Sequence, residues 1–234
     1  MPGLLIIMAK RPSLGLVKTR FSPPLRPEDA LALYEAFLSD TIRLVLAACA
    51  QAPGITPALA YSPSDALDHF AQLVPPGFLL LPQQGDDLGE RLASLPRQAA
   101  ALGFGPVAML NSDSPTLPPP YVVGCFTELA RSDVDVVLGP CTDGGYYLVG
   151  VKAPQNAIFT GIGWSTGQAM DDTIAAAAEA GLRVALLPAW YDADTAGDLL
   201  LLKTHVEKYP RLAPATRAAM AALPPGTLDG VTRS

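Results

Sequence analysis

Three clusters of charged side chains each follow a short apolar segment of this 234-residue sequence. The first is a basic loop over residues 10–20, the second contains Asp113, and the third contains Asp192 and Asp194. Carboxylates hold hard cations such as Mg²⁺, such a cation can bridge phosphate oxygens, and Lys or Arg neutralises charge on a leaving phosphate. The combination indicates chemistry on a phosphate-containing ligand.

The basic loop leaves a segment with the pattern of a buried strand. Residues 4–9 are an unbroken apolar run, which is typical of a strand covered on both faces in a parallel sheet. Ligands of open α/β sheets bind at the carboxyl ends of such strands. Because the two acidic clusters also follow predicted strands, at 106–110 and 183–187, we expect all three clusters to converge at one edge of the sheet.

Strands and helices alternate along the chain, which predicts a three-layer α/β fold with a mostly parallel mixed sheet. We expect strands at residues 4–9, 55–61 (weakened by Pro57), 78–81, 106–110, 134–138, 146–151 and 183–187. We expect helices at about 28–50 and 64–73, a helix after the 82–92 loop that Pro96 kinks or shortens, and helices at about 119–131, 168–180, 198–207 and 214–222. This gives one domain over residues 1–210, with a C-terminal helix and tail over 211–234.

Composition limits the classes of function. Half of the residues are hydrophobic and 16% are charged, as in globular proteins. The formal charge of −6 and the pI of about 4.8 argue against a general nucleic-acid surface. Five of the sixteen Lys and Arg residues precede Glu28, which favours a small anionic ligand.

Neither a targeting signal nor a membrane span is expected. The longest charge-free apolar stretch, residues 44–64, is interrupted by prolines, and the N-terminal apolar run is short and precedes its charges. A cytoplasmic location is therefore expected. The three cysteines lie far apart, so we expect reduced thiols, and two histidines leave little scope for a His-rich metal site. A Walker lysine loop, a Rossmann glycine motif and a nucleophile elbow are all missing.

Each cluster also has a purely structural interpretation. The basic loop could be a solvated surface, Asp113 could cap the next helix, and Asp194 could start a helix with Thr195 and Asp198. Residues 143–145 form a turn signal in their own right, and Glu90 with Arg91 could be an ordinary helix-surface pair. The joint placement of the clusters favours a site over these alternatives.

Motifs in five segments resemble one protein family. They are Ala9-Lys10-Arg11-Pro12 with Gly15-x-Val17-Lys18-Thr19-Arg20, then Asp87-Leu88-Gly89-Glu90-Arg91, Ser112-Asp113-Ser114-Pro115-x-Leu117, Asp143-Gly144-Gly145-Tyr146-Tyr147-Leu148-x-Gly150 and Asp192-x-Asp194-Thr195-x-x-Asp198-Leu199. In this order they resemble the DUF2064 proteins, GT-A-like members of the nucleotide-diphospho-sugar transferase superfamily. The resemblance covers roughly residues 3–205.

The resemblance implies a Rossmann-like GT-A fold that binds a nucleotide with its N-terminal half and a small-molecule acceptor with its C-terminal half. It implies Mg²⁺ (or Mn²⁺) on Asp113 and on Asp194, with Asp192 as a rival for the second position. Other roles follow by motif: nucleotide binding by Lys10, Arg11, Gly15, Lys18, Arg20, Gln84, Asp87 and Arg91, and acceptor binding by Gly144, Gly145 and Tyr146. Lys18, Asp113 and Asp143 are the candidate catalytic residues.

Three functions remain open at this point. Glycosyl transfer from a nucleotide sugar is slightly preferred. Many GT-A glycosyltransferases carry Asp-x-Asp at the metal strand, however, whereas this chain has Ser112-Asp113-Ser114-Pro115, which is more like nucleotidyltransferases. Transfer of a nucleotide from an NTP to a phosphorylated acceptor, with release of pyrophosphate, is therefore the alternative, and a non-catalytic nucleotide-binding protein is the third. Oligomeric state is left open.

Overall fold

A computed structural model describes residues 1–232, so the last two residues of the predicted C-terminal tail, 233 and 234, lie outside the described part. Backbone contacts divide the chain into two compact units. The first unit contains residues 1–11, 45–111 and 119–191, and the second contains residues 12–44, 112–118 and 192–234. Each unit is therefore assembled from segments that are distant in the sequence.

The first unit is built on a mixed sheet of seven strands within the described residues. The strands are β1 (Gly3–Lys10), β2 (Ile55–Ser62), β3 (Leu79–Pro82), β4 (Val107–Leu110), β5 (Val136–Pro140), β6 (Tyr146–Val151) and β7 (Val184–Leu186). Their order across the sheet is β3-β2-β1-β4-β6-β5-β7. Only β6 runs antiparallel to its neighbours, β4 and β5. The predicted mostly parallel α/β fold, with each of its seven strands, is confirmed.

The helices also follow the predicted pattern. They are α1 (Pro27–Gln51), α2 (Leu67–Leu73), α3 (Leu88–Ala101), α4 (Pro119–Leu129), α5 (Ala169–Glu179), α6 (Asp198–Lys208) and α7 (Pro214–Ala221), with short 3₁₀ turns η1 (Thr19–Phe21) and η2 (Ala157–Phe159). Helix α3 continues past Pro96 to Ala101, so the proline does not shorten it as expected. Burial of Leu95 and Ala99 in the core offsets the cost of the proline.

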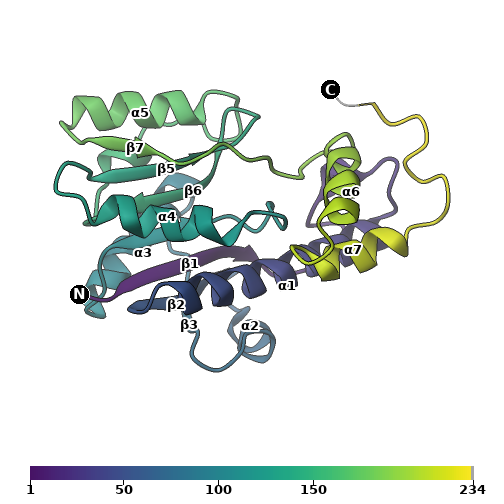
Figure 1. Cartoon of the computed structure of the whole chain (residues 1–234), viewed down its shortest axis with the longest axis horizontal. Coiled ribbons are helices and arrows are strands. Elements are labelled where there is room, and N and C mark those ends of the chain that lie inside the picture. Colours follow the sequence, from purple (N-terminus) through teal and green to yellow (C-terminus); the bar gives the residue numbers. More distant parts are fainter. Residues whose placement is uncertain (233–234) are drawn as a thin grey trace. The chain divides into compact units, whose positions relative to one another are not determined.

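Helices cover both faces of the sheet (Figure 1). Alternate residues of each strand point to opposite faces. Val149 and Val151 of β6 belong to the core cluster that contains α3 side chains, whereas Gly150 between them faces α4. A Cβ atom on Gly150 would lie 2.3 Å from Cys125 Sγ, so the glycine lets α4 pack closely on the sheet.

Pro57 does not interrupt β2, contrary to the weakening expected from the sequence. All eight residues of β2 pair with β1, and Pro57 lies opposite Leu5. On its other side, β2 pairs with β3 only over residues 58–61. Pro57 therefore lies just before the segment paired with β3, where a missing backbone N–H costs no ladder bond.

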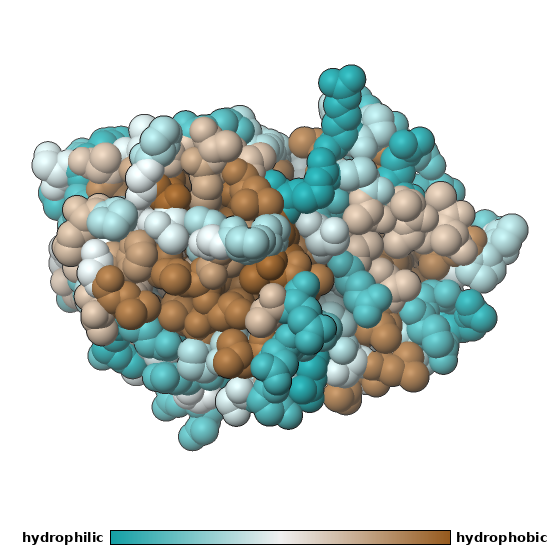
Figure 2. Space-filling model, turned by 90° about the horizontal axis from the view of Figure 1, so that it is seen from below, coloured by the Kyte–Doolittle hydropathy of each residue, from teal (hydrophilic) through white to brown (hydrophobic). Residues whose placement is uncertain are grey.

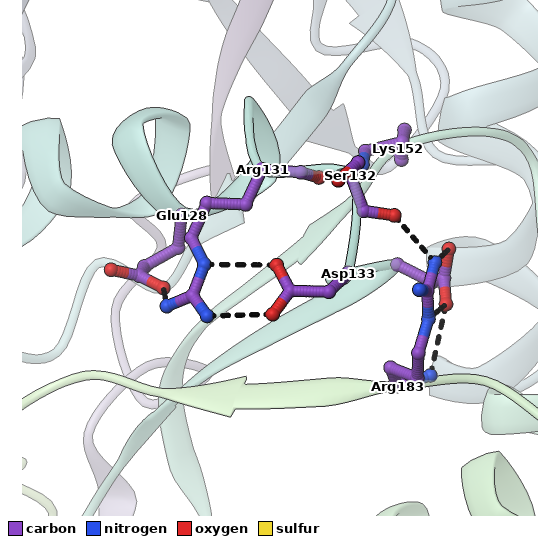
Figure 3. Close-up of polar contacts among 7 residues, drawn as sticks. Glu128, Arg131, Ser132, Asp133, Lys152 and Arg183 are labelled. Atoms are coloured by element: carbon purple, nitrogen blue, oxygen red, sulfur yellow. Dashed lines mark hydrogen bonds and ion pairs between the residues drawn. The ribbon is translucent and has the colours of Figure 1, made fainter.

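Ion pairs connect the segments around the start of β5. Arg131 lies between Glu128 and Asp133, at 2.9 and 2.8 Å (Figure 3). Arg183 approaches Asp135 with its Nε at 2.8 Å and holds the pKa of this carboxyl at about 2, well below its ordinary value. Such pairs at the protein surface each contribute little to stability, and here they link the end of α4 with the residues just before β5 and β7.

Apolar side chains also reach the surface of the first unit, as is normal for a globular protein. Leu67 and Leu73 of α2 are 45% and 39% exposed. The face drawn in Figure 2 shows brown apolar residues interspersed with hydrophilic ones. Cys49, Cys125 and Cys141 are free thiols, as expected from their spacing. Among the described helices, none combines the length and hydropathy that a membrane crossing requires.

The second unit packs α6 and α7 with residues 27–44 of α1 around its own buried side chains. These include Phe21, Leu33, Phe37, Leu199, Leu202 and Val206. Asp40 of α1 is fully buried and accepts hydrogen bonds from the first backbone N–H groups of α7, at Ala215 (3.2 Å) and Thr216 (2.7 Å). A carboxylate at this end of a helix satisfies free donors and complements the helix dipole.

Replacing Asp40 with Ala should therefore loosen α7. We expect Asp40→Ala to lower the free energy of unfolding by about 2 kcal/mol, because one buried and one partly buried N–H group lose their acceptor. Urea denaturation measures the loss. Glu35→Ala, at an exposed position of the same helix, is the matched control and should stay within about 0.5 kcal/mol of the parent. Equal stability of the two variants would contradict the capping role.

Candidate functional site

The ammonium group of Lys18 joins the acids that the sequence placed in separate clusters. Lys18 Nζ lies 2.5 Å from Asp113 Oδ1 and 2.8 Å from Asp194 Oδ1, and it donates to the carbonyl of Ala193 at 2.7 Å. All of these residues belong to the second unit. The expected convergence of the basic loop with the two acidic segments is therefore seen for these three side chains.

Backbone and side-chain bonds hold the two acidic segments in place. The backbone N–H of Ala193 donates to the carbonyl of Asp113 at 2.9 Å. Asp198, in the first turn of α6, accepts from the N–H groups of Asp194 (3.1 Å) and Thr195 (2.7 Å). The helix starts where it was predicted, but no side chain of Asp194 or Thr195 caps it. Instead, Asp198 in its first turn accepts hydrogen bonds from the backbone of these two residues and holds the loop that carries Asp194.

Two aromatic rings complete the surroundings of Lys18. Its Nζ lies 5.5 Å from the ring centroids of both Phe21 and Phe37, within the range of cation–π attraction. The side chain of Lys18 is only 6% exposed. Its backbone adopts the left-handed conformation, with φ 46° and ψ 39°, which a lysine seldom occupies. The local fold therefore constrains Lys18 to face the acids.

The charges of this cluster influence one another. Burial opposes the charge on Lys18, but Asp113 and Asp194 outweigh it, so the pKa of the ammonium lies above its ordinary value. Burial raises the pKa of Asp113, Lys18 opposes that rise, and Asp194 adds to it. Lys18 is therefore a firmly protonated cation at neutral pH.

Asp192, the rival for the second metal position, has a different partner. It accepts a hydrogen bond from the hydroxyl of Ser114, the residue after Asp113. Asp194, in contrast, contacts the same ammonium as Asp113. Asp113 and Asp194 thus contact one cation, and the choice between Asp194 and Asp192 as the second metal acid stays a prediction.

The oxygen atoms around Lys18 Nζ are suited to a hard metal ion. Two carboxylate oxygens and one carbonyl oxygen surround a single position at 2.5–2.8 Å. Mg²⁺ and Mn²⁺ prefer such oxygen ligands. The residues present thus fit a divalent cation, provided that the ammonium of Lys18 moves away from its position.

The other residues of the predicted basic cluster lie in varied surroundings. Arg11 forms an ion pair with Asp65, at 3.2 Å within the first unit. Lys10 is the exposed last residue of β1, and Arg20 is an exposed residue of η1. Gly15 has a φ of +71°, which allows a tight turn in the loop. Their proposed contacts with phosphate stay predictions.

The predicted nucleotide loop 84–91 is held by its own hydrogen bonds. Asp87 caps α3 by accepting from the N–H of Glu90 at 2.8 Å, and Glu90 accepts from the N–H of Asp86 at 2.8 Å. Arg91 Nε donates to the carbonyl of Gly85 at 3.0 Å. Asp87, Glu90 and Arg91 thus have structural roles in a preformed loop, in addition to any role in binding.

This loop borders a pocket of about 670 Å³ in the first unit, a size typical of small-molecule sites. One wall is the start of α3 with Gln84 and Asp87, and the other is the segment 156–164, including Trp164. Arg97 of α3 donates to Asn156 across the pocket at 2.5 Å. Arg91 is not among the lining residues.

The pocket depends on the absence of a side chain at Gly89. A Cβ atom there would lie 2.3 Å from the carbonyl of Phe159 and 2.9 Å from Trp164 Nε1. Sequence reasoning missed Trp164, Arg97 and the aromatic neighbours of Lys18. A tryptophan within the Gly- and Thr-rich segment 158–167 was the available signal for the pocket.

The predicted acceptor segment forms a turn. Asp143 accepts from the N–H of Gly145 at 3.0 Å, which fits the structural interpretation of this motif. Gly144 has a φ of +87°, and a Cβ atom on it would lie 2.1 Å from the carbonyl of Gly167. Tyr146 packs against Trp164 with ring centroids 6.2 Å apart, and burial raises its pKa. Catalytic or acceptor-binding roles for these residues stay predictions.

Closing the pocket at Gly89 should have a measurable cost. We expect Gly89→Ala to lower the free energy of unfolding by about 1–3 kcal/mol, because the segment of Phe159 and Trp164 must shift. Urea denaturation followed by tryptophan fluorescence measures this loss of stability. Gly124→Ala on α4 is the control: its Cβ would lie 3.5 Å from Leu187, an ordinary contact, so stability should be equal or higher. A Gly89→Ala variant that is as stable as the parent would contradict the described packing.

Solved structures share this fold. A candidate nucleotide-diphospho-sugar transferase from Desulfovibrio desulfuricans G20 is 28% identical, with a TM-score of 0.84 and 94% of each chain covered. CMP:2-keto-3-deoxy-manno-octonic acid synthetase complexed with CTP has a TM-score of 0.56 at 12% identity, over 90% of this chain and 100% of that chain. A cytidylyltransferase from Leptospira borgpetersenii serovar Hardjo-bovis (strain JB197) has a TM-score of 0.57 at 10% identity, over 99% and 98%.

The two more distant structures show similarity of fold alone, a GT-A-like arrangement shared with the first. No curated protein sequence matches the chain. The family described as "Uncharacterized protein conserved in bacteria (DUF2064)" matches residues 45–166, just over half of the sequence. The matched range includes the 84–91 loop, Asp113 and the 143–146 turn. The chain therefore belongs to the DUF2064 family.

Proposed function

We propose that this protein is a metal-dependent transferase that uses a nucleoside-diphosphate sugar as donor and transfers the glycosyl group to a small-molecule acceptor. The observation that carries the proposal is the set of oxygens from Asp113, Asp194 and Ala193 around one cationic position. Such a set suits a metal ion that binds the diphosphate of a nucleotide.

Asp113 and Asp194 are the residues that would hold Mg²⁺ or Mn²⁺, with Asp192 as the rival. Bound there, the metal supplies positive charge to the diphosphate and so stabilises it as a leaving group. The ion pairs described above support this choice, because they bring Asp113 and Asp194 to one cation.

Basic residues are proposed to contact the phosphates of the donor. They are Lys10, Arg11, Lys18 and Arg20, with Gly15 shaping their loop. Side chains of Lys and Arg bind phosphate through charge-assisted hydrogen bonds. Lys18 is proposed to be catalytic as well, since its charge would oppose the negative charge that builds up on the departing nucleoside diphosphate. The concentration of basic residues before Glu28 in an acidic protein supports these roles.

The pocket beside α3 is proposed to take the nucleoside part of the donor. Gln84 offers an amide and Asp87 a carboxylate, which can pair with a base or ribose, and Trp164 offers a flat apolar surface for a ring. Arg91 is proposed to act through the loop that it holds in place. The volume of about 670 Å³ supports an occupant of this size.

The turn at residues 143–146 is proposed to serve the acceptor. Gly144, Gly145 and Tyr146 are half-buried, and the backbone groups of both glycines are bonded within the fold, so the support for this role is the motif itself. Asp143 is proposed as a catalytic acid or base for the acceptor. We further propose a cytoplasmic location, which the free thiol state of all three cysteines supports. Small molecules are the proposed partners, and nucleic acid is not among them.

Nucleotidyl transfer is the second candidate. Asp113 is followed by Ser114 and Pro115 where many glycosyltransferases have a second acid, and the hydroxyl of Ser114 bonds Asp192. In this reaction an acceptor phosphate attacks the α-phosphate of an NTP, and pyrophosphate leaves. The similarity to the candidate nucleotide-diphospho-sugar transferase favours glycosyl transfer as the first candidate.

The leaving group distinguishes these functions. We expect a panel of nucleotide sugars with Mg²⁺ to yield nucleoside diphosphate and no pyrophosphate, as measured by chromatography and a pyrophosphate assay. Pyrophosphate from an NTP panel would favour the second candidate. Binding of nucleotide without either product across both panels would contradict transfer and favour a non-catalytic nucleotide-binding protein.

Removing one of the two carboxylates proposed to hold the metal should strongly reduce this activity. We expect Asp113→Asn to reduce turnover by at least about a hundredfold, because one of the two carboxylates that hold the metal is lost. Asp133→Asn, in the surface ion pair with Arg131, is the control and should leave turnover unchanged. Retention of metal-dependent activity in Asp113→Asn would show that the metal lies elsewhere.

A further inference from the structure

The position that suits a divalent metal holds a cation of the protein itself. Lys18 Nζ has three N–H donors and three oxygen partners, namely Asp113 Oδ1, Asp194 Oδ1 and the carbonyl of Ala193. Every donor of the ammonium is thus used within the second unit. In this arrangement no donor is left over for a phosphate oxygen.

A divalent metal and the ammonium cannot share this position. Two cations within 3 Å of each other repel strongly, and the repulsion is stronger away from bulk water. Since the side chain of Lys18 is only 6% exposed, solvent does little to screen it. Asp113 and Asp194 are 31% and 38% exposed, so a metal ion from solution can reach them.

The backbone at Lys18 supports a specific role for this arrangement. A left-handed conformation at a non-glycine residue carries strain, and such strain persists where the surrounding structure requires it. The next residues, 19–21, form η1, which places Phe21 beside the ammonium. The loop thus directs the side chain of Lys18 between the two acids, instead of letting it extend into solvent.

We propose that Lys18 occupies the metal position of Asp113 and Asp194 while metal is absent and is displaced when the divalent metal binds. This inference rests on the proposed function. The ammonium keeps the two carboxylates together when metal is absent. Its displacement frees three donors, which can then bind a phosphate of the donor nucleotide. Metal and nucleotide should therefore bind with positive coupling, because each favours the displaced position of Lys18.

Binding of Mn²⁺ alone, followed by electron paramagnetic resonance, tests the proposal. We expect Lys18→Met to bind Mn²⁺ about tenfold or more tightly than the parent, because the competing cation is gone and two acids lack a partner. Lys18→Arg, which keeps the charge, should not gain affinity. A lysine with only a structural role would give unchanged or weaker binding when removed, and that result would overturn the proposal.

A second measurement uses the unaltered protein, in case Lys18→Met does not fold. Acetylation of lysine amines, read by peptide mass spectrometry, should be slow at Lys18 without metal. Adding Mn²⁺ should raise its rate several-fold, whereas the exposed Lys203 should react at one rate in both conditions. If Lys18 is acetylated equally slowly with and without bound Mn²⁺, the proposed displacement is wrong.

Asp113→Asn separates failure of this inference from failure of the proposed function. If this variant loses Mn²⁺ while Lys18→Met shows no gain, the metal site holds and displacement is wrong. Mn²⁺ binding is also measured for Asp113→Asn alone and for the double variant with Lys18→Met. If both bind Mn²⁺ as tightly as the parent does, the metal assignment is wrong, and so is the present inference.

Discussion

Burial of the Lys18 ammonium is the constraint on which the second unit depends. A buried charge without partners is very costly, and removing one member of a buried ion pair typically costs about 3–5 kcal/mol. The residues that satisfy Lys18 come from segments about 95 and 175 positions away in the sequence, as Asp113 and Asp194 show. One lysine thus fixes how three distant segments meet, while the sheet of the first unit rests on apolar packing.

The same bonds relate stability to chemistry. Acids placed to hold a metal repel each other, and such sites are often strained when the metal is absent. Here an internal cation offsets that repulsion, and Asp198 fixes the loop of Asp194 from behind. The second unit can therefore keep both acids in position without a loss of stability. In the proposed reaction, the Lys18 ammonium leaves this position when the divalent metal binds.

Much of the fold could be predicted from the sequence because it depends on local patterns. The apolar run at residues 4–9 and the helical spacing after Glu28 each gave the correct element within about two residues. Pro57 and Pro96 misled because the effect of a proline depends on its neighbours in space. Convergence of the basic loop with the acidic segments was expected, but the direct ion pairs of Lys18 with Asp113 and Asp194 were not, since side-chain partners depend on tertiary packing. Trp164 and the pocket beside α3 could not be placed for the same reason.

The position of Pro57 has a consequence for the behaviour of the sheet in solution. Strand β3 is short and covers only residues 58–61 of β2, so the first residues of β2 lie at an open border. Open borders of sheets invite strands from other molecules, which is a common route to aggregation. A proline at this border cannot donate a hydrogen bond to an incoming strand. At the half-buried start of β2, Pro57 thus offers no donor to an incoming strand, while its pairing with β1 stays intact.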